Sequence, residues 1–219
     1  IRDLHSVEVA DSTVLGNPNS WEGFTNFMME QRRTCSKTHR VWSTLSYKLL
    51  DQIEEYLPSV DNIPTLIPKD TKPCLLHADL TDENVLGHFT REESSDEEDQ
   101  QPSSKKPKTD APDWIPTGLI DFGDAMLGDP MYELMALHIS VFRCNKQLLK
   151  TFLNTYGWRN LPKDPEQFVY KAMCYTLLHA CDAMKSVYQY NSEYRRIQNL
   201  KELANTIWNI FPQESMQIE

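Results

Sequence analysis

Two short segments carry side chains whose types and spacing could do chemistry. The first runs from His77 to Asn84, with Asp79 two residues after the histidine and Asn84 five residues after that aspartate. The second begins at Asp121, which follows an apolar stretch and precedes Gly123, a residue that permits a sharp turn. A carboxylate at the end of a strand beside a loop carboxylate can bind a metal ion and position a base.

Phosphoryl transfer requires such a set, because the enzyme must orient a hydroxyl and hold magnesium ions that neutralise phosphate charge. Asn84 and Asp121 would supply the oxygen ligands that magnesium prefers, and Asp79 would accept the hydroxyl proton as the catalytic residue. His77 is expected to form structural hydrogen bonds. The competing interpretation is that these polar residues only cap turns through bonds to the backbone.

The two segments together resemble the catalytic loop and metal-binding strand of the aminoglycoside phosphotransferase and choline kinase family. The resemblance is specific over residues 76–137 and is carried by His77-x-Asp79-x-x-x-x-Asn84 and Asp121-Phe122-Gly123-Asp124-Ala125-x-x-Gly128-Asp129-Pro130. It implies the helical C-terminal lobe of a protein-kinase-like fold, ATP and Mg²⁺ as cofactors, Asp79 as the base, and Asn84 and Asp121 as magnesium and cofactor ligands. The same residues are more loosely similar to kinase-like domains appended to eukaryotic JmjC-domain proteins.

The function predicted from this resemblance is an ATP- and magnesium-dependent phosphotransferase acting on a hydroxyl group of a small molecule. An alternative from a different class is a catalytically silent kinase-like interaction module in a larger multidomain protein. A third is a magnesium-dependent phosphohydrolase that uses the same carboxylates. The expected partner is a small-molecule hydroxyl acceptor, the oligomeric state is left open, and the N-terminal nucleotide-binding lobe is expected to be absent from this chain.

Composition narrows the classes of partner. The 219 residues include 22 basic and 32 acidic side chains, and the net charge of −10 argues against coating a nucleic acid. No stretch approaches the roughly 18 apolar residues of a membrane span. Five cysteines without a C-x-x-C pair predict reduced thiols and an intracellular location, cytoplasmic or nuclear, and no His/Cys cluster has zinc-ligand spacing. The start at Ile1, without a methionine or hydrophobic leader, suggests an excerpt of something longer.

Apolar periodicity and turn residues predict an α+β fold, mostly helical with a small central β-ribbon, in one domain over residues 1–219. Residues 91–113 hold eight acidic and four basic residues and almost nothing apolar apart from Ala111, so they are predicted to be a disordered insertion. Strands are predicted at residues 74–77, 84–89 and 117–122, and helices at residues 21–32, 42–57, 131–142, 146–156, 165–190 and 192–210, with the tail of another at residues 1–9.

For the other polar residues a purely structural role is the simpler interpretation. Asp129 is expected to cap the helix that begins near Pro130. His179 and Asp182, three residues apart on a predicted helix, are left outside the site as a surface or half-buried pair. Within the insertion, the basic run at residues 105–108 could be a nuclear-import signal and the serines before acidic residues could be phosphorylated, although a solvated spacer explains both.

Overall fold

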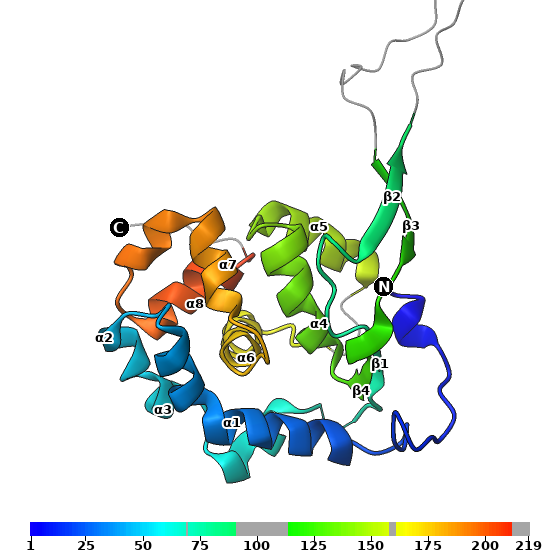
Figure 1. Ribbon diagram of the computed structural model, residues 1–219, viewed down its shortest axis with the longest axis horizontal. Coiled ribbons are helices and arrows are strands. Elements are labelled where there is room, and N and C mark those ends of the chain that lie inside the picture. Colours follow the sequence, from blue (N-terminus) through cyan, green and yellow to red (C-terminus); the bar gives the residue numbers. More distant parts are fainter. Residues whose placement is uncertain (69, 91–113, 158–160, 212–219) are drawn as a thin grey trace, which may run out of the picture.

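The computed structural model describes residues 1–68, 70–90, 114–157 and 161–211 and is an α+β structure in which helices predominate (Figure 1). This confirms the predicted fold class in its coarse form. The helices are α1 (Glu22–Trp42), α2 (Tyr47–Leu50), α3 (Ile53–Tyr56), α4 (Pro130–Ala136), α5 (Lys146–Tyr156), α6 (Pro165–Leu177), α7 (Ala183–Tyr190) and α8 (Leu200–Trp208). Shorter turns are the 3-10 segments Leu4–Ser6, Val60–Leu66, Phe122–Asp124 and Ser192–Arg196 and the π-helical segment Leu137–Val141.

The strands form two separate antiparallel pairs where the sequence predicts one ribbon. β1 (Cys74–Leu76) pairs with β4 (Met126–Gly128), and β2 (Val85–Phe89) pairs with β3 (Trp114–Leu119). β4 escaped prediction because three residues are too few to show a period of two. β3 lies earlier than predicted, at Trp114–Leu119, because its first two residues pair with the end of β2.

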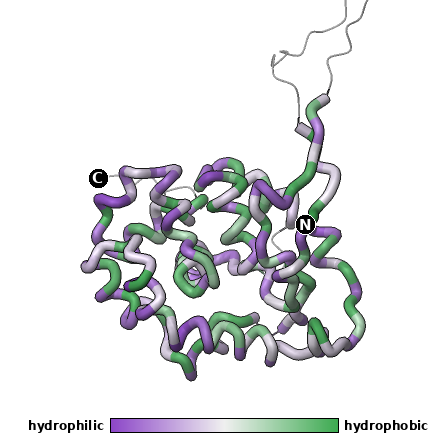
Figure 2. The backbone as a smooth tube through the Cα atoms, viewed as in Figure 1, coloured by the Kyte–Doolittle hydropathy of each residue, from purple (hydrophilic) through white to green (hydrophobic). Residues whose placement is uncertain are grey.

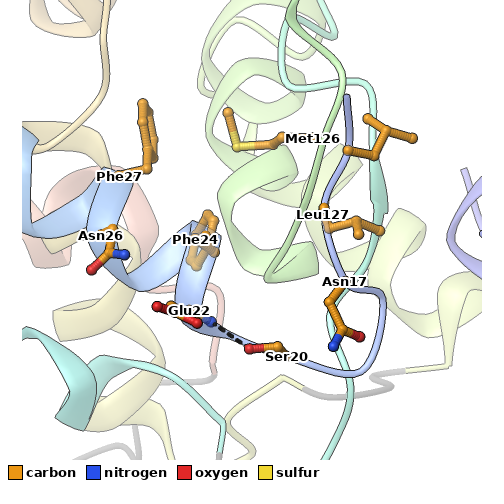
Figure 3. Close-up of a pocket in the computed structure, with 11 residues that line it drawn as sticks. Asn17, Ser20, Glu22, Phe24, Asn26, Phe27, Met126 and Leu127 are labelled. Carbon is orange, nitrogen blue, oxygen red and sulfur yellow. Dashed lines mark hydrogen bonds between the residues drawn. The ribbon is translucent and has the colours of Figure 1, made fainter. Parts of the chain in front are cut away.

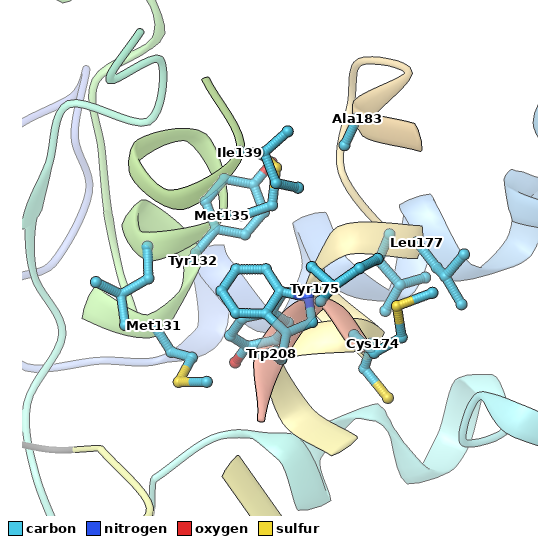
Figure 4. Packing of buried hydrophobic residues seen from close by; sticks show 14 of the residues in the cluster. Met131, Tyr132, Met135, Ile139, Cys174, Tyr175, Leu177, Ala183 and Trp208 are labelled. Atoms are coloured by element: carbon cyan, nitrogen blue, oxygen red, sulfur yellow. The ribbon is translucent and has the colours of Figure 1, made fainter. Parts of the chain in front are cut away.

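The core gathers around α6, which packs against α4, α7 and α8. Tyr175 of α6 packs against Tyr132 of α4 with ring centroids 6.0 Å apart, and Figure 4 shows side chains of α4 and α6 gathered in one cluster with Trp208 of α8. α1 buries a single stripe with steps of three or four residues, and apolar and polar positions recur along the helix (Figure 2). The members of that stripe are Phe24, Met28, Arg32, Cys35 and His39.

The helix predicted over residues 42–57 is not continuous. α1 extends to Trp42 and ends at Ser43, whose left-handed φ of 57° closes the helix, and α2 and α3 follow as single turns. Between them, the Gln52 side chain accepts the backbone N–H of Leu200 at 2.9 Å and donates to the carbonyl of Gln198 at 2.9 Å. Leu45, Leu49, Ile53 and Leu57, which recur at helical spacing within this range, are buried, so apolar periodicity indicates burial here but not a continuous helix.

Three other predicted helices also differ from the structure. The one over residues 165–190 divides into α6 and α7, because the Asp182 carboxylate caps α7 by accepting the backbone N–H of Lys185 at 3.2 Å. Residues 131–142 pass from α4 into the π-helical segment, and residues 192–210 become a 3-10 turn followed by α8. Only the turn Leu4–Ser6 forms near the N-terminus. The insertion and the import signal predicted within residues 91–113 lie outside the described residues.

No helix in the described part of the chain has the length and apolar character needed to cross a membrane. The five cysteines are all free thiols. Cys35, Cys144 and Cys174 are buried, Cys74 is half-buried and Cys181 is exposed.

Candidate functional site

The two segments singled out by the sequence lie side by side. β1 leads into the segment that begins at His77, and β3 leads into the segment that begins at Asp121. The Nε2 atom of His77 lies 2.7 Å from the carbonyl oxygen of Ile120, and the backbone N–H of Ile120 donates to the carbonyl of Asn84 at 3.1 Å. His77 therefore has the structural role expected of it, and it joins the two loops.

Asn84 orients Asp79. The Asn84 side-chain amide donates to the Asp79 carbonyl at 2.9 Å and to Oδ2 of the Asp79 carboxylate at 3.0 Å. Asn84 is buried and Asp79 is half-buried, so the pair lies at the boundary between core and solvent. The backbone of Thr81 closes the loop, because its N–H donates to the Asp79 carbonyl at 2.9 Å.

Each loop contains a non-glycine residue in the left-handed region. Asp121 has φ +60°, and its side chain accepts the backbone N–H of Gly123 at 3.4 Å. Ala78 has φ +64°. Such conformations cost about 1–2 kcal/mol per residue and persist only where the surroundings hold them. Both segments that the sequence identified therefore contain a strained backbone position.

Glu133 of α4 holds the first loop. Its fully buried carboxylate accepts the backbone N–H of His77 at 2.7 Å and that of Ala78 at 3.2 Å. The Nε2 atom of His5 lies 3.6 Å from the same carboxylate. The sequence alone did not predict that Glu133 supports the loop. A usable signal was present, because Glu133 lies between the apolar residues Tyr132 and Leu134. Carboxylates are almost never fully buried without partners.

Asp129 caps α4 as expected, and it also binds α6. Its carboxylate accepts the backbone N–H of Met131 at 2.9 Å and the hydroxyl of Tyr175 at 2.9 Å, and it pairs with the ammonium of Lys171. Burial, reinforced by the negative charge of Asp129, raises the pKa of Tyr175 well above its usual value. The helix that carries Glu133 is thus tied to the core by a buried ion pair that the sequence did not reveal.

The π-helical segment Leu137–Val141 contacts the loop that carries Asp79, at Asp82. The hydroxyl of Ser140 donates to the Asp82 carboxylate at 3.2 Å, and the Arg143 guanidinium lies 3.9 Å from it. Arg143 and the next residue, Cys144, both have positive φ. π-helical turns cost stability and occur frequently at functional sites.

The break between α6 and α7 places the thiol of Cys181 beside the ring of His179. The ring of His179 is buried and stacks on Tyr132 with centroids 4.8 Å apart, and its Nδ1 lies 2.9 Å from the Cys181 sulfur. Burial lowers the pKa of His179 to about 4. Cys181 is exposed as a residue, but partial desolvation of its sulfur beside the His179 ring raises the pKa of Cys181 to about 11, and the carboxylates of Asp79 and Asp124 act in the same direction. Cys181 is therefore a protonated thiol and a poor nucleophile near neutral pH.

A separate cavity of about 380 Å³ lies between the start of α1 and β4 (Figure 3). Phe24, Phe27 and Met126 supply apolar walls, while Asn17 and Asn26 supply polar groups. None of the three predicted site residues lines it. The cavity is thus distinct from the pair of loops.

No protein-family model matches the chain. A lysine-specific demethylase, JMJ21 of Arabidopsis thaliana, is 25% identical over 224 residues. The alignment covers 90% of this chain and 22% of the relative. The chain thus spans about a fifth of the length of this relative.

These findings contradict the predicted ATP- and magnesium-dependent phosphotransferase. The resemblance to aminoglycoside phosphotransferases and choline kinases, and to kinase-like domains appended to JmjC-domain proteins, is not matched by any family model, and the relative is named a demethylase. The prediction of ATP and Mg²⁺ as cofactors is therefore wrong as well. The alternative of a catalytically silent kinase-like module is unsupported. The structure supplies a physical reason for the misleading spacing, because His77 and Asn84 satisfy hydrogen bonds within the loops themselves. The individual site roles of Asp79, Asn84 and Asp121 stay predictions.

Proposed function

We propose that this chain is one domain of a larger protein related to lysine demethylases, and that it binds a basic, lysine-bearing segment there. The observation that carries the proposal is the alignment, which takes in 90% of this chain but 22% of the demethylase. A unit that aligns almost whole within a far longer relative behaves as one domain among several.

The residues of this chain do not fit the metal centre of an oxidative demethylase. Non-haem Fe(II) oxygenases, which would use 2-oxoglutarate here, bind iron with two histidines and one carboxylate. All six histidines lie among the described residues, and no group of three or more His, Cys, Asp or Glu in that part of the chain could hold a metal ion. His77 is occupied at both ring nitrogens, by the Ile120 carbonyl at 2.7 Å and the Asp79 backbone N–H at 3.3 Å. The oxidative centre therefore belongs to another part of the larger protein.

The charge of the two loops supports binding of a cation. Asp79 is oriented by Asn84, while Asp121 and Asp124 are exposed on the facing loop. The rings of His77 and Phe122 lie with centroids 4.6 Å apart, so the two loops that carry these carboxylates are in contact. A lysine ammonium has three donors and no acceptor, so it matches a set of acceptor-only carboxylates, and methylation removes donors while keeping the positive charge. The net charge of −10 favours approach of a basic peptide.

Two further predictions remain open beside this proposal. The finer fold assignment, the C-terminal lobe of a protein-kinase-like architecture, stays a prediction, as does an intracellular location in the cytoplasm or nucleus. Neither is needed for the binding proposal.

Calorimetry with a lysine-rich peptide tests the binding site. We expect Asp79→Asn and Asp121→Asn each to weaken binding by about tenfold, or ~1.4 kcal/mol, because each removes one carboxylate charge. Asp61→Asn is the matched control, since Asp61 is an exposed acid in the turn Val60–Leu66, outside both loops. Equal affinity of all three variants for the peptide would contradict the proposed binding site. A peptide with its lysines acetylated should not bind.

The demethylase part of the proposal needs the larger protein. Loss of methyl groups from a trimethyl-lysine peptide, followed by mass spectrometry, should require iron. Activity retained by residues 1–219 alone would contradict the placement of the metal centre elsewhere.

A further inference from the structure

Exposed apolar side chains are concentrated on the β2–β3 hairpin and the loop after it. Half of the large apolar residues that are exposed in the described part of the chain lie there. They are Leu86, Phe89, Trp114, Ile115, Ile120 and Phe122, with exposed fractions between 42% and 62%. Scattered exposed apolar residues are ordinary, but a contiguous set on one element marks an interaction surface.

Both faces of the hairpin contribute to this surface. Phe89 lies directly opposite Trp114 in the strand register, and the Trp114 indole covers Gly87 so closely that a Cβ atom there would approach it to 2.3 Å. The strand pairing shifts register between Leu86 and Gly87, and beyond that shift Ile115 follows Trp114 and pairs with His88, so it lies on the other face.

Only the base of the hairpin is anchored to the body. Val85 and Leu119 pack against the core, whereas the outer part of the ribbon extends away from the helices (Figure 1). In the described residues each strand has a single partner, so the other edge of each is unpaired. A two-stranded hairpin is marginally stable in water unless something packs on it.

The hairpin also lacks the charges that protect exposed strands. β2 and β3 contain no Asp, Glu, Lys or Arg, although such residues make up 25% of the chain. Free edge strands are normally protected by charged side chains, prolines or covering elements, and Pro116 alone is of this kind here. An apolar, uncharged hairpin with unpaired strand edges is typical of an element that another segment covers.

We propose that the β2–β3 hairpin is the docking surface for another part of the same, longer polypeptide, which rests on the proposed function above. The relative's chain extends far beyond the matched region, which is 22% of its length, so a covering segment is available within one polypeptide. Residues 91–113, between the two strands, cannot supply an apolar cover, because Ala111 and three prolines are their only non-polar residues. The occupant therefore presents apolar side chains and a strand edge that pairs with β2 or β3.

Site-directed photo-crosslinking in the larger protein tests this docking. A benzophenone amino acid at Ile115 should form crosslinks within one polypeptide to residues outside 1–219. The same probe at Val14, which is 89% exposed and far from the hairpin in sequence, is the matched control and should give none. Crosslinks between two copies, crosslinks only to residues 91–113, or no crosslinks would each overturn the proposal.

Hydrogen exchange provides a second measurement that does not depend on the probe. In the larger protein, Leu86→Lys with Ile115→Lys should speed exchange of the β2 and β3 amides at least about tenfold, because the cover is lost. Val14→Lys with Val41→Lys should leave these amides unchanged. Unaltered exchange in the first variant would contradict the docking. The result is separable from the proposed function, since demethylation and peptide binding are measured independently of these amides.

Discussion

The buried carboxylate of Glu133 accepts the backbone N–H of Ala78, a residue with φ +64°. An alanine in this conformation is strained, and the acceptor from α4 offsets part of the cost. The loop that carries Asp79 is therefore shaped by a helix more than 50 residues further along the chain.

Glu133→Gln should destabilise the protein by about 2–4 kcal/mol. Glutamine has one acceptor oxygen, so its NH₂ group would face one of the two buried backbone N–H groups. Urea unfolding provides the measurement. Adding Ala78→Gly to this variant should recover about 1 kcal/mol, because glycine adopts positive φ without strain. A cost below about 0.5 kcal/mol for Glu133→Gln would show that the carboxylate does not hold the loop.

Asp129→Asn should cost about 3–5 kcal/mol, because it leaves the buried ammonium of Lys171 without a counter-charge. Lys171→Met should cost less, since the Asp129 carboxylate keeps the Met131 N–H and the Tyr175 hydroxyl. In a double-mutant cycle by chemical denaturation, the combined variant should be more stable than the sum of the single effects predicts. Simple additivity would mean that the two charges do not interact.

Stability should decrease as the pH falls from about 6.5 to about 4. Burial lowers the pKa of both His138 and His179 to about 4, whereas both titrate near 6.5 in the unfolded chain. In this window the unfolded state binds protons that the folded state does not, so stability rises with pH by up to about 1.4 kcal/mol per unit for each histidine. Unfolding midpoints between pH 4 and 8 provide the test.

The matched variants for the pH profile are His179→Phe and His88→Gln. The first should reduce the slope below pH 6.5, because phenylalanine keeps a ring against Tyr132 but does not titrate. The second is the control, because His88 is exposed and lies outside the core. A profile that is identical in all three proteins would exclude His179 as a source.

Gly128→Ala should destabilise the protein by about 1–3 kcal/mol through overpacking. A Cβ atom at this position would lie 2.6 Å from the ring of Phe24 and 2.8 Å from Leu76, both buried. Gly118→Ala is the matched control, because nothing lies within 4 Å of the Cβ position on the exposed β3 strand. Thermal unfolding of the two variants should separate them, and equal midpoints would contradict the close packing of β4 on α1.

Features with local causes could be predicted from the sequence. α5 occupies the predicted residues, because Asn145 caps its start and Gly157, with φ +91°, ends it. The cap at Asp129 is also set by neighbouring residues. The pairing of Asp79 with Asn84 spans five residues, so the sequence identified both members of that pair.

Features that depend on contacts between residues far apart in the sequence were decided only by the tertiary structure. The division of residues 42–57 follows bonds from Gln52 to residues near the start of α8, and neither partner is visible in local periodicity. Glu133 reaches the first loop from α4, so the support of the site could not be read from the two loops alone. The spacing of polar residues in the sequence indicates which of them share a loop. Their hydrogen bonds and their electrostatic surroundings depend on the elements that fold against that loop.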